Sequence, residues 1–308
     1  ITSDRQGYET QIAGDVIDLF IDHLDKIGNV PKITLYLYTR GGDTAVAWNL
    51  VNLLRQYCDE LDVIIPHKAH SAGTLISLGA NSIIMTKQAT LGPIDPSVNT
   101  PLNPPIPGAP FGHTIPVSVE AVKGYLEFAR EELLIKDDKA LSNIMIKLSE
   151  TVHPLVLGQV YRSRAQIKML AEKLLINQIS DSDKINRIIS FLCSESGSHD
   201  YTITAKEAKE GLGLNVINPD DEQYKLIKQI YDDLNCDLEF SKPFDPRVML
   251  VNSGGAYKVQ RAVIETVEGG SHCCVSEGKL SIIQAPGLNM PQGINDQRTF
   301  DGWIHEKS

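Results

Sequence analysis

The chain has 308 residues, of which 42% are hydrophobic and 22% charged, a composition typical of a folded protein with a substantial core. Its formal net charge of −10 excludes the basic surface that non-specific nucleic-acid binding needs. No run approaches the ~18 consecutive apolar residues of a membrane span. Because the sequence opens at Ile1 without an initiator Met, a signal peptide or an N-terminal membrane anchor stays open.

The five cysteines are an odd number, and no two of them have the CxxC spacing. This usage is typical of a reducing compartment rather than of a disulfide framework, so we expect a cytoplasmic protein. We also expect all five to be small buried hydrophobes; they are Cys58, Cys193, Cys236, Cys273 and Cys274.

The first ninety residues alternate between helical and strand patterns. Apolar residues at helical spacing predict helices, and β-rich runs predict strands. The expected helices cover residues 8–27, 44–57 and 72–80, and the expected strands cover 33–38, 62–65 and 82–85. Strands joined by helices of this length pair in parallel through right-handed crossovers. The fold class expected is therefore α/β, a layered fold of repeated β-α units.

A Pro-rich stretch over residues 99–117 predicts a long surface loop, and the pattern changes after it. Helical patterns follow over residues 118–150, 156–175, 181–193 and 204–213, and Ser118 is expected to cap the first of them. After Pro243 the pattern turns to short alternating runs, which predict a small β-rich C-terminal appendage. We expect one domain over residues 1–242 and this appendage over 243–308.

Two segments could carry chemistry. A strand over 33–38 runs into Gly41 and Gly42, where glycine lets an N–H point outward. A second strand leads to Ser71 at the entrance of an apolar helix, where the helix dipole favours a developing alkoxide. The N–H groups of Gly42 and Ala72 would then hold an oxyanion. The pattern alone favours the other interpretation, in which Ser71 is a helix N-cap and the glycines are turn residues.

The sequences of these segments resemble those of a known protein family. YLYTRGGD is similar to the YxNSPGG turn of the Clp proteases, and AHSAGTLISLGA to their nucleophile segment. With LGPIDPS, HPLVLGQVYRSR and SHDYTITAKEAKEGLGL, the chain resembles the serine dehydrogenase proteinase family, which groups with Clp protease and signal peptide peptidase A. The resemblance covers residues 1 to about 217. It implies a Clp/crotonase-like fold, Ser71 as nucleophile, and oxyanion donors at Gly42 and Ala72.

The chain differs from the Clp proteases in the residue that could act as general base. No His lies between His70 and His113, and the corresponding zone LGPIDPS offers only Asp95. The segment that resembles the one with the Clp triad acid carries Asp200. Signal peptide peptidase A instead uses a Lys about fifty residues past its Ser, and Lys123 lies 52 residues past Ser71. We therefore predict a Ser71–Lys123 dyad.

Four further residues are possible supporting groups: Gly41, Asp95, His199 and Asp200. Asp95 and His199 are the other candidates for the base. His67 and His70 have no third ligand spaced to join them, so we expect no metal site. His70 is expected to be structural, and His153 to pack or to cap a helix. No organic cofactor is implied.

The function expected is that of a serine peptidase, which cleaves peptide bonds through an acyl-enzyme. Its substrate would be an extended peptide or unfolded protein, and the resemblance implies a homo-oligomer. One alternative is a crotonase-type acyl-CoA enzyme, which uses the same paired N–H groups but has no need for Ser71. The other is a catalytically inactive scaffold that binds peptides or partners.

Overall fold

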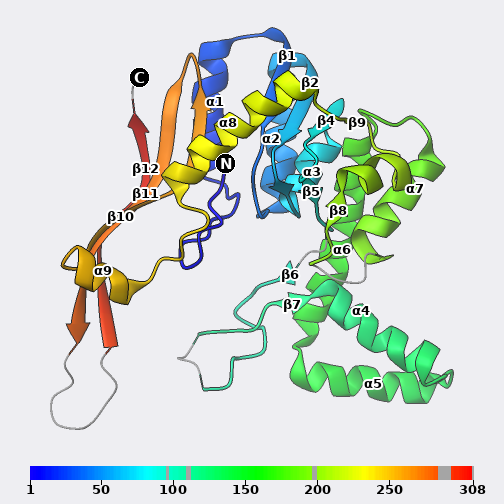
Figure 1. Ribbon diagram of the computed structural model, residues 1–308. Coiled ribbons are helices and arrows are strands. Elements are labelled where there is room, and N and C mark those ends of the chain that lie inside the picture. Colours follow the sequence, from blue (N-terminus) through cyan, green and yellow to red (C-terminus); the bar gives the residue numbers. More distant parts are fainter. Residues whose placement is uncertain (95–96, 109–111, 196–199, 284–292, 307–308) are drawn as a thin grey trace. The chain divides into compact units, whose positions relative to one another are not determined.

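The structure, a computed structural model, describes the chain except for residues 95–96, 109–111, 196–199, 284–292 and 307–308 (Figure 1). The chain forms two compact units. The first unit consists of residues 1–91 and 203–308, and the second of residues 92–202. The functional boundary that we expect between residues 242 and 243 stays a prediction.

A parallel sheet forms the centre of the first unit. Its strand order is β1-β2-β4-β9, with β1 (Val30–Tyr36), β2 (Cys58–Ile65), β4 (Ser82–Met85) and β9 (Val216–Ile217). Helix α2 (Thr44–Tyr57) connects β1 to β2 and packs against β2 and α3 (Ala72–Leu78) (Figure 1). All seven residues of α3 are buried, which explains its small, apolar sequence. The expected α/β fold of repeated β-α units is confirmed.

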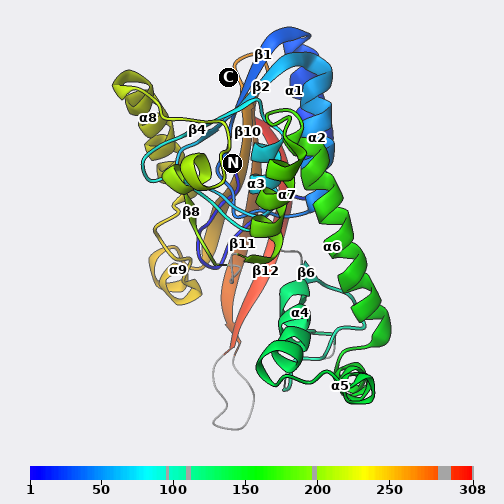
Figure 2. The same ribbon diagram turned by 90° about the vertical axis from the view of Figure 1, so that its right-hand side faces the viewer.

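Two elements of this unit have the bounds expected from the pattern, namely α2 and β4. Helix α1 (Val16–Ile27), which lies beside α2 (Figure 2), begins later than the expected residue 8. The prediction over residues 8–15 is wrong because their apolar side chains serve tertiary contacts. Tyr8 packs edge-on against Phe244, and Ile12 pairs with Gly42.

A second, smaller sheet carries the segment before Ser71. Its order is β3-β5-β8, with β3 (Lys68–Ala69), β5 (Thr90–Leu91) and β8 (Ile203–Thr204). Thr204 accepts a hydrogen bond from the Glu207 N–H (3.3 Å) at the start of the next turn. The helix expected over 204–213 is short and includes a π-helix, η3 (Glu207–Gly211).

The C-terminal part of the first unit is a three-stranded antiparallel sheet, seen in orange and red in Figure 2. It consists of β10 (Ala256–Thr266), β11 (Gly270–Ile283) and β12 (Gly293–Glu306). The expected β-rich character of this region is confirmed. Two helices precede it, α8 (Asp221–Leu238) and α9 (Pro246–Asn252). The sequence pattern missed α8, although Asp220 and Gln223 form a capping box at its start.

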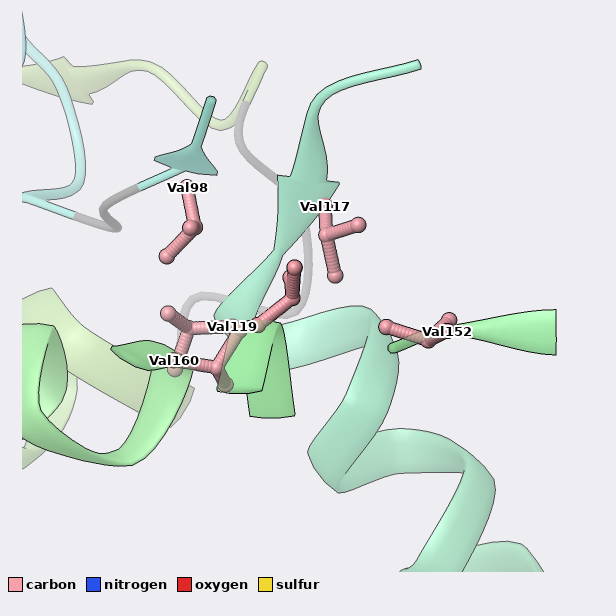
Figure 3. Close-up of a cluster of buried hydrophobic side chains, with 6 residues drawn as sticks. Val98, Val117, Val119, Val152 and Val160 are labelled. Atoms are coloured by element: carbon pink, nitrogen blue, oxygen red, sulfur yellow. The ribbon is translucent and has the colours of Figure 1, made fainter. Parts of the chain in front are cut away.

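The second unit is mostly helical. It contains β6 (Ser97–Val98), β7 (Val117–Ser118), α4 (Val119–Glu127), the π-helix η1 (Phe128–Glu132), α5 (Asp138–Thr151), α6 (Pro154–Leu175), α7 (Ser182–Ser190) and the π-helix η2 (Phe191–Glu195). Valines of β6, β7, α4 and α6 and the end of α5 gather in one core cluster (Figure 3); they are Val98, Val117, Val119, Val152, Val156 and Val160.

The single helix expected over residues 118–150 is interrupted. Leu134 has a positive φ of 53°, and Asp137 caps the new helix α5 by accepting from the Ala140 N–H (2.8 Å). The expected caps are confirmed, because Ser118 accepts from the Ala121 N–H and His153 from the Leu155 N–H.

Four of the five cysteines are buried, as expected, and none of the five forms a disulfide. Cys236 is the exception, because it lies on an exposed face of α8, so that prediction is wrong for this residue. Among the helices that the structure describes, none combines the length and the apolar character needed to cross a membrane.

Candidate active site

Ser71 lies in a strained turn between β3 and α3. Its φ is 50° and its ψ −112°, a conformation that glycine adopts readily and other residues rarely do. Ser71 precedes α3, yet its side chain makes no capping hydrogen bond to the helix. Ser71 therefore occupies the N-cap position of α3 without capping the helix through its side chain. Strain of this kind, about 1–3 kcal/mol, is found mostly at functional positions.

Hydrogen bonds on both sides hold the backbone of Ser71 in this conformation. The His70 N–H donates to the Thr39 carbonyl (3.1 Å), which joins the turn to the segment after β1. The Gly73 N–H donates to the His70 carbonyl (2.8 Å), and the Leu75 N–H donates to the Ser71 carbonyl (3.1 Å). The start of α3 and the segment after β1 thus hold the backbone of Ser71 together.

Gly41 lies directly against Ser71. A Cβ added to Gly41 would lie 2.7 Å from Cβ and 3.2 Å from Oγ of Ser71, and 2.8 Å from the His70 carbonyl oxygen. The φ of Gly41 is 118°, and its N–H donates to Thr39 Oγ1 (3.0 Å). Only glycine fits here, so the Gly-Gly turn and the turn at Ser71 form one candidate site.

Gly42 and Ala72 carry the two N–H groups that we expect to bind an oxyanion. Among the described residues, neither N–H has a hydrogen-bond acceptor. Buried N–H groups without a partner are rare, and Ala72 is fully buried. Ala72 opens the helix, where N–H groups have no partner within the helix. Two such groups, one beside Ser71 and one beside Gly41, are what an oxyanion hole requires.

One charged side chain, which the sequence analysis missed, links the segment of the two glycines to the segment of Ser71. Asp4 forms ion pairs with Arg40 (3.2 Å between Oδ1 and Nε) and with Lys68, and it accepts from the Tyr38 hydroxyl (3.2 Å). Arg40 precedes Gly41, and Lys68 lies in β3. Burial, with Asp4 nearby, raises the pKa of Tyr38 well above its ordinary value. The only sequence signal was the charge of Arg40 and Lys68 next to the two motifs.

The two histidines before Ser71 have structural contacts. His70 Nε2 hydrogen-bonds to Thr90 Oγ1 of β5 (2.9 Å). The His67 ring stacks on Tyr231 at 5.8 Å, and burial, followed by the charge of Lys68, lowers the pKa of His67. In the part of the chain that the structure describes, no three His, Cys, Asp or Glu side chains are arranged to hold a metal ion.

Lys123, the expected base, lies on α4 in the second unit, whereas Ser71 lies in the first. Its Nζ is 3.3 Å from Glu127 Oε1 and 3.6 Å from Glu120 Oε2, and its side chain is 25% exposed. A lysine that takes a proton has to be neutral, so it would have to give up these two ion pairs. The Ser71–Lys123 dyad stays a prediction.

The remaining candidates are placed as follows. Asp200 is exposed in the second unit. Asp95 and His199 lie outside the described residues. Their roles stay predictions.

A cavity of about 220 Å³ lies within the first unit, next to the Gly-Gly turn. Its lining is mostly apolar and includes Ile12 and Thr39, which hydrogen-bond to the turn, but it does not include Ser71. Ser71 therefore does not line this cavity.

The Gly-Gly turn and the strained turn at Ser71 lie in a segment that matches a known protein family. Residues 24–107 match the family of ClpP-like SDH-type serine proteinases. This segment contains Gly41, Gly42 and Ser71, so the resemblance to the serine dehydrogenase proteinase family is confirmed over it.

Two curated relatives come from Methanocaldococcus jannaschii. Uncharacterized protein MJ0137 is 32% identical over 199 residues, which are 64% of this chain and 57% of the relative. Uncharacterized protein MJ1495 is 30% identical over 197 residues, which are 64% of this chain and 56% of the relative. The chain thus spans less than two thirds of the length of these relatives.

Three solved structures have folds similar to that of this chain. A mutant of 1510-N, a membrane-bound stomatin-specific protease, shares 19% identity over 71% of this chain and 79% of its own, with a TM-score of 0.41. Another mutant of 1510-N, solved in complex with a substrate peptide, has a TM-score of 0.39, with 17% identity over 69% and 75%. ClpP1 from Listeria monocytogenes has a TM-score of 0.37, with 13% identity over 68% and 89%.

Proposed function

We propose that this protein is a serine peptidase with Ser71 as its nucleophile. The observation that carries the proposal is the strained backbone of Ser71 together with the Gly41 contact, because this pair of turns leaves a hydroxyl free beside two N–H groups without acceptors. The match of residues 24–107 to a serine proteinase family supports the same activity.

In the proposed reaction, Ser71 Oγ attacks the carbonyl carbon of a peptide bond while a base takes the hydroxyl proton. The carbonyl oxygen becomes an oxyanion, which accepts hydrogen bonds from the N–H groups of Gly42 and Ala72. The C–N bond then breaks, the leaving amine takes the proton, and an acyl-enzyme remains. A water molecule attacks this ester in the same way, which releases the acid and restores Ser71.

Lys123 is the base that we propose, on the strength of its distance along the chain from Ser71 and the resemblance to signal peptide peptidase A. Asp95 and His199 are the other candidates. Asp200 is proposed to support the site by hydrogen bonding rather than to move a proton.

A fluorophosphonate probe tests the nucleophile directly, because it phosphonylates an activated serine. We expect one adduct on the wild-type protein, located at Ser71 by mass spectrometry, and none on Ser71→Ala. Ser77→Ala is the matched control, because Ser77 lies on the same helix and its hydroxyl donates to the Gly73 carbonyl. A wild-type protein that hydrolyses peptides but is labelled at another serine would contradict the assignment.

A second candidate is an inactive scaffold that binds peptides at the same turns. The observation that favours it is that, among the described residues, no side chain forms a hydrogen bond with the Ser71 hydroxyl. A scaffold binds a peptide without any labelling of Ser71. A crotonase-type acyl-CoA enzyme is disfavoured, since its mechanism gives no reason for strain at Ser71.

The proposed substrate is an extended peptide or an unfolded protein. A homo-oligomer is also proposed, and exposed apolar side chains on the second unit support it, among them Leu134, Ile146, Leu155 and Tyr161. Analytical ultracentrifugation distinguishes an oligomer from a monomer. The five cysteines, none of which forms a disulfide, support a reducing compartment such as the cytoplasm, and membrane association is left open.

A further inference from the structure

The segment from Ser3 to Ile12 connects the Gly-Gly turn to the C-terminal sheet. At one end, the Ile12 N–H donates to the Gly41 carbonyl (2.8 Å), and the Ile12 carbonyl accepts from the Asp43 N–H (2.9 Å). Ile12 therefore holds the backbone on both sides of Gly42. The contact is so close that a Cβ added to Gly42 would lie 2.2 Å from the Ile12 carbonyl oxygen.

These bonds set the direction of the Gly42 N–H. The Gly41 carbonyl and the Gly42 N–H belong to one planar trans peptide group, in which the two point in opposite directions. Since the Gly41 carbonyl is bound to Ile12, the Gly42 N–H points away from Ile12. Glycines flank this peptide, with φ values of 118° and 148°, so side chains do little to prevent it from flipping. The bond from Ile12 is what holds it.

The other end of the segment is anchored in β10. The Arg261 carbonyl accepts from the Thr10 hydroxyl (2.6 Å) and from the Ser3 N–H (2.7 Å), and Thr10 Oγ1 also accepts from this Ser3 N–H (2.7 Å). Arg261 lies at a β-bulge, where the register with β11 shifts between Gln260 and Ala262. A bulged residue leaves the regular ladder, and its carbonyl is thereby available to another partner.

We propose that Thr10 is a positioning residue of the oxyanion hole. Through Thr10, the bulge in β10 fixes the segment that ends at Ile12, and Ile12 fixes the Gly41–Gly42 peptide. The C-terminal sheet then helps to position the oxyanion hole through Thr10. This inference rests on the proposed role of Gly42 as an oxyanion donor.

Thr10→Val tests the inference, because it keeps the shape of the side chain and removes both hydrogen bonds of Oγ1. For hydrolysis of a peptide ester we expect kcat to fall roughly 10-fold, a part of the 10²–10³ that one oxyanion donor contributes, with little change in KM. Thr10→Ser keeps the hydroxyl and should restore kcat. The matched control is Thr86→Val, which removes a buried hydroxyl bond of the same length, 2.6 Å, to the Pro66 carbonyl. We expect its kcat to stay at the wild-type value.

Hydrogen exchange of the Asp43 amide gives a readout that does not depend on activity. This amide donates to the Ile12 carbonyl, so it should exchange faster in Thr10→Val and not in Thr86→Val or Thr10→Ser. An unchanged exchange rate in Thr10→Val overturns the inference, whether or not the protein is a peptidase. Faster exchange with an unchanged kcat overturns it as well. A wild-type protein that neither hydrolyses esters nor reacts at Ser71 overturns the proposed function itself, and with it the catalytic role of Thr10.

Discussion

Gly41 and Ser71 lie in van der Waals contact although they are far apart in the sequence, and a side chain at position 41 would occupy the space of the serine. Gly41→Ala would place a methyl group 2.7 Å from Cβ of Ser71. We expect the nucleophile to be displaced and fluorophosphonate labelling to slow roughly 10²-fold, because a shift of about 1 Å at a reacting group has that effect.

Gly28→Ala is the control for this prediction. Gly28 also has a positive φ, of 70°, but a Cβ there would meet no atom within 4 Å. Gly28→Ala should lower the free energy of unfolding by about 1–3 kcal/mol through backbone strain, and it should leave the labelling rate unchanged. Equal labelling of both variants at equal folded fractions would contradict the contact argument.

Removal of the strain at Ser71 should stabilise the protein. Ser71→Gly relieves the conformation at φ 50° and ψ −112°, and we expect the free energy of unfolding to rise by about 1 kcal/mol. Ser71→Ala keeps the strain and loses no capping bond, so its stability should stay within about 0.5 kcal/mol of the wild type. Neither variant should be labelled.

Urea denaturation measures these differences. Ser142→Gly is the comparison variant, at an exposed position in the middle of α5. It should lower the free energy of unfolding, because glycine lowers helix stability by about 1 kcal/mol. If Ser71→Gly proved as destabilising as Ser142→Gly, the turn at Ser71 would not be strained in solution.

Lys123→Arg decides the identity of the base. A guanidinium can keep the ion pairs to Glu120 and Glu127 but cannot be deprotonated, so we expect peptide hydrolysis to be lost while the fold is retained. Lys147→Arg is the control, because Lys147 is likewise paired with a carboxylate, Glu150, at 2.9 Å. Retained hydrolysis in Lys123→Arg would leave Asp95 or His199 as the base.

The stability of the first unit should depend on pH through a buried pair of histidines. His23 Nε2 hydrogen-bonds to His272 Nδ1 (2.9 Å), and the His272 ring stacks on His305 at 4.2 Å. Burial, followed by the positive neighbours His272 and Lys26, lowers the pKa of His23, whereas Asp22 raises it slightly. Burial, followed by His305 and Lys26, likewise lowers the pKa of His272, with Asp22 again opposing.

Because both pKa values are lower in the folded protein, the unfolded state binds more protons below its own pKa of about 6.5. The contribution to stability is complete above that pH and is lost as the pH falls, by at most about 1.4 kcal/mol per pH unit for each group. His23→Gln should reduce this slope in urea denaturation, and His113→Gln, at an exposed position, should not. An equal slope in His23→Gln would show that carboxylates cause the dependence.

The candidate site was predictable where it depends on local sequence. The strand before Gly41 and Gly42 and the apolar helix after Ser71 follow from patterns of a few residues, whereas the proposal of Ser71 as the nucleophile depends on the resemblance to a known family. The strain at Ser71 was not predictable, because it arises from hydrogen bonds to Thr39, a residue of another segment. The role of Asp4 was not predictable either, because its partners come from β3 and from the segment after β1.

The sequence by itself determined the order of β-α units, the bounds of α2 and β4, and the β-rich C-terminal region, because apolar periodicity and turn residues are properties of neighbouring positions. Only the tertiary structure decided that residues 8–15 are not helical. Their periodic apolar side chains fit a helix equally well, but Tyr8 gains a packing partner in Phe244, and Ile12 gains two backbone hydrogen bonds at the Gly-Gly turn. Contacts between distant segments outweigh a local preference whose energy per residue is only a fraction of 1 kcal/mol, at most about 0.7 kcal/mol for ordinary residues.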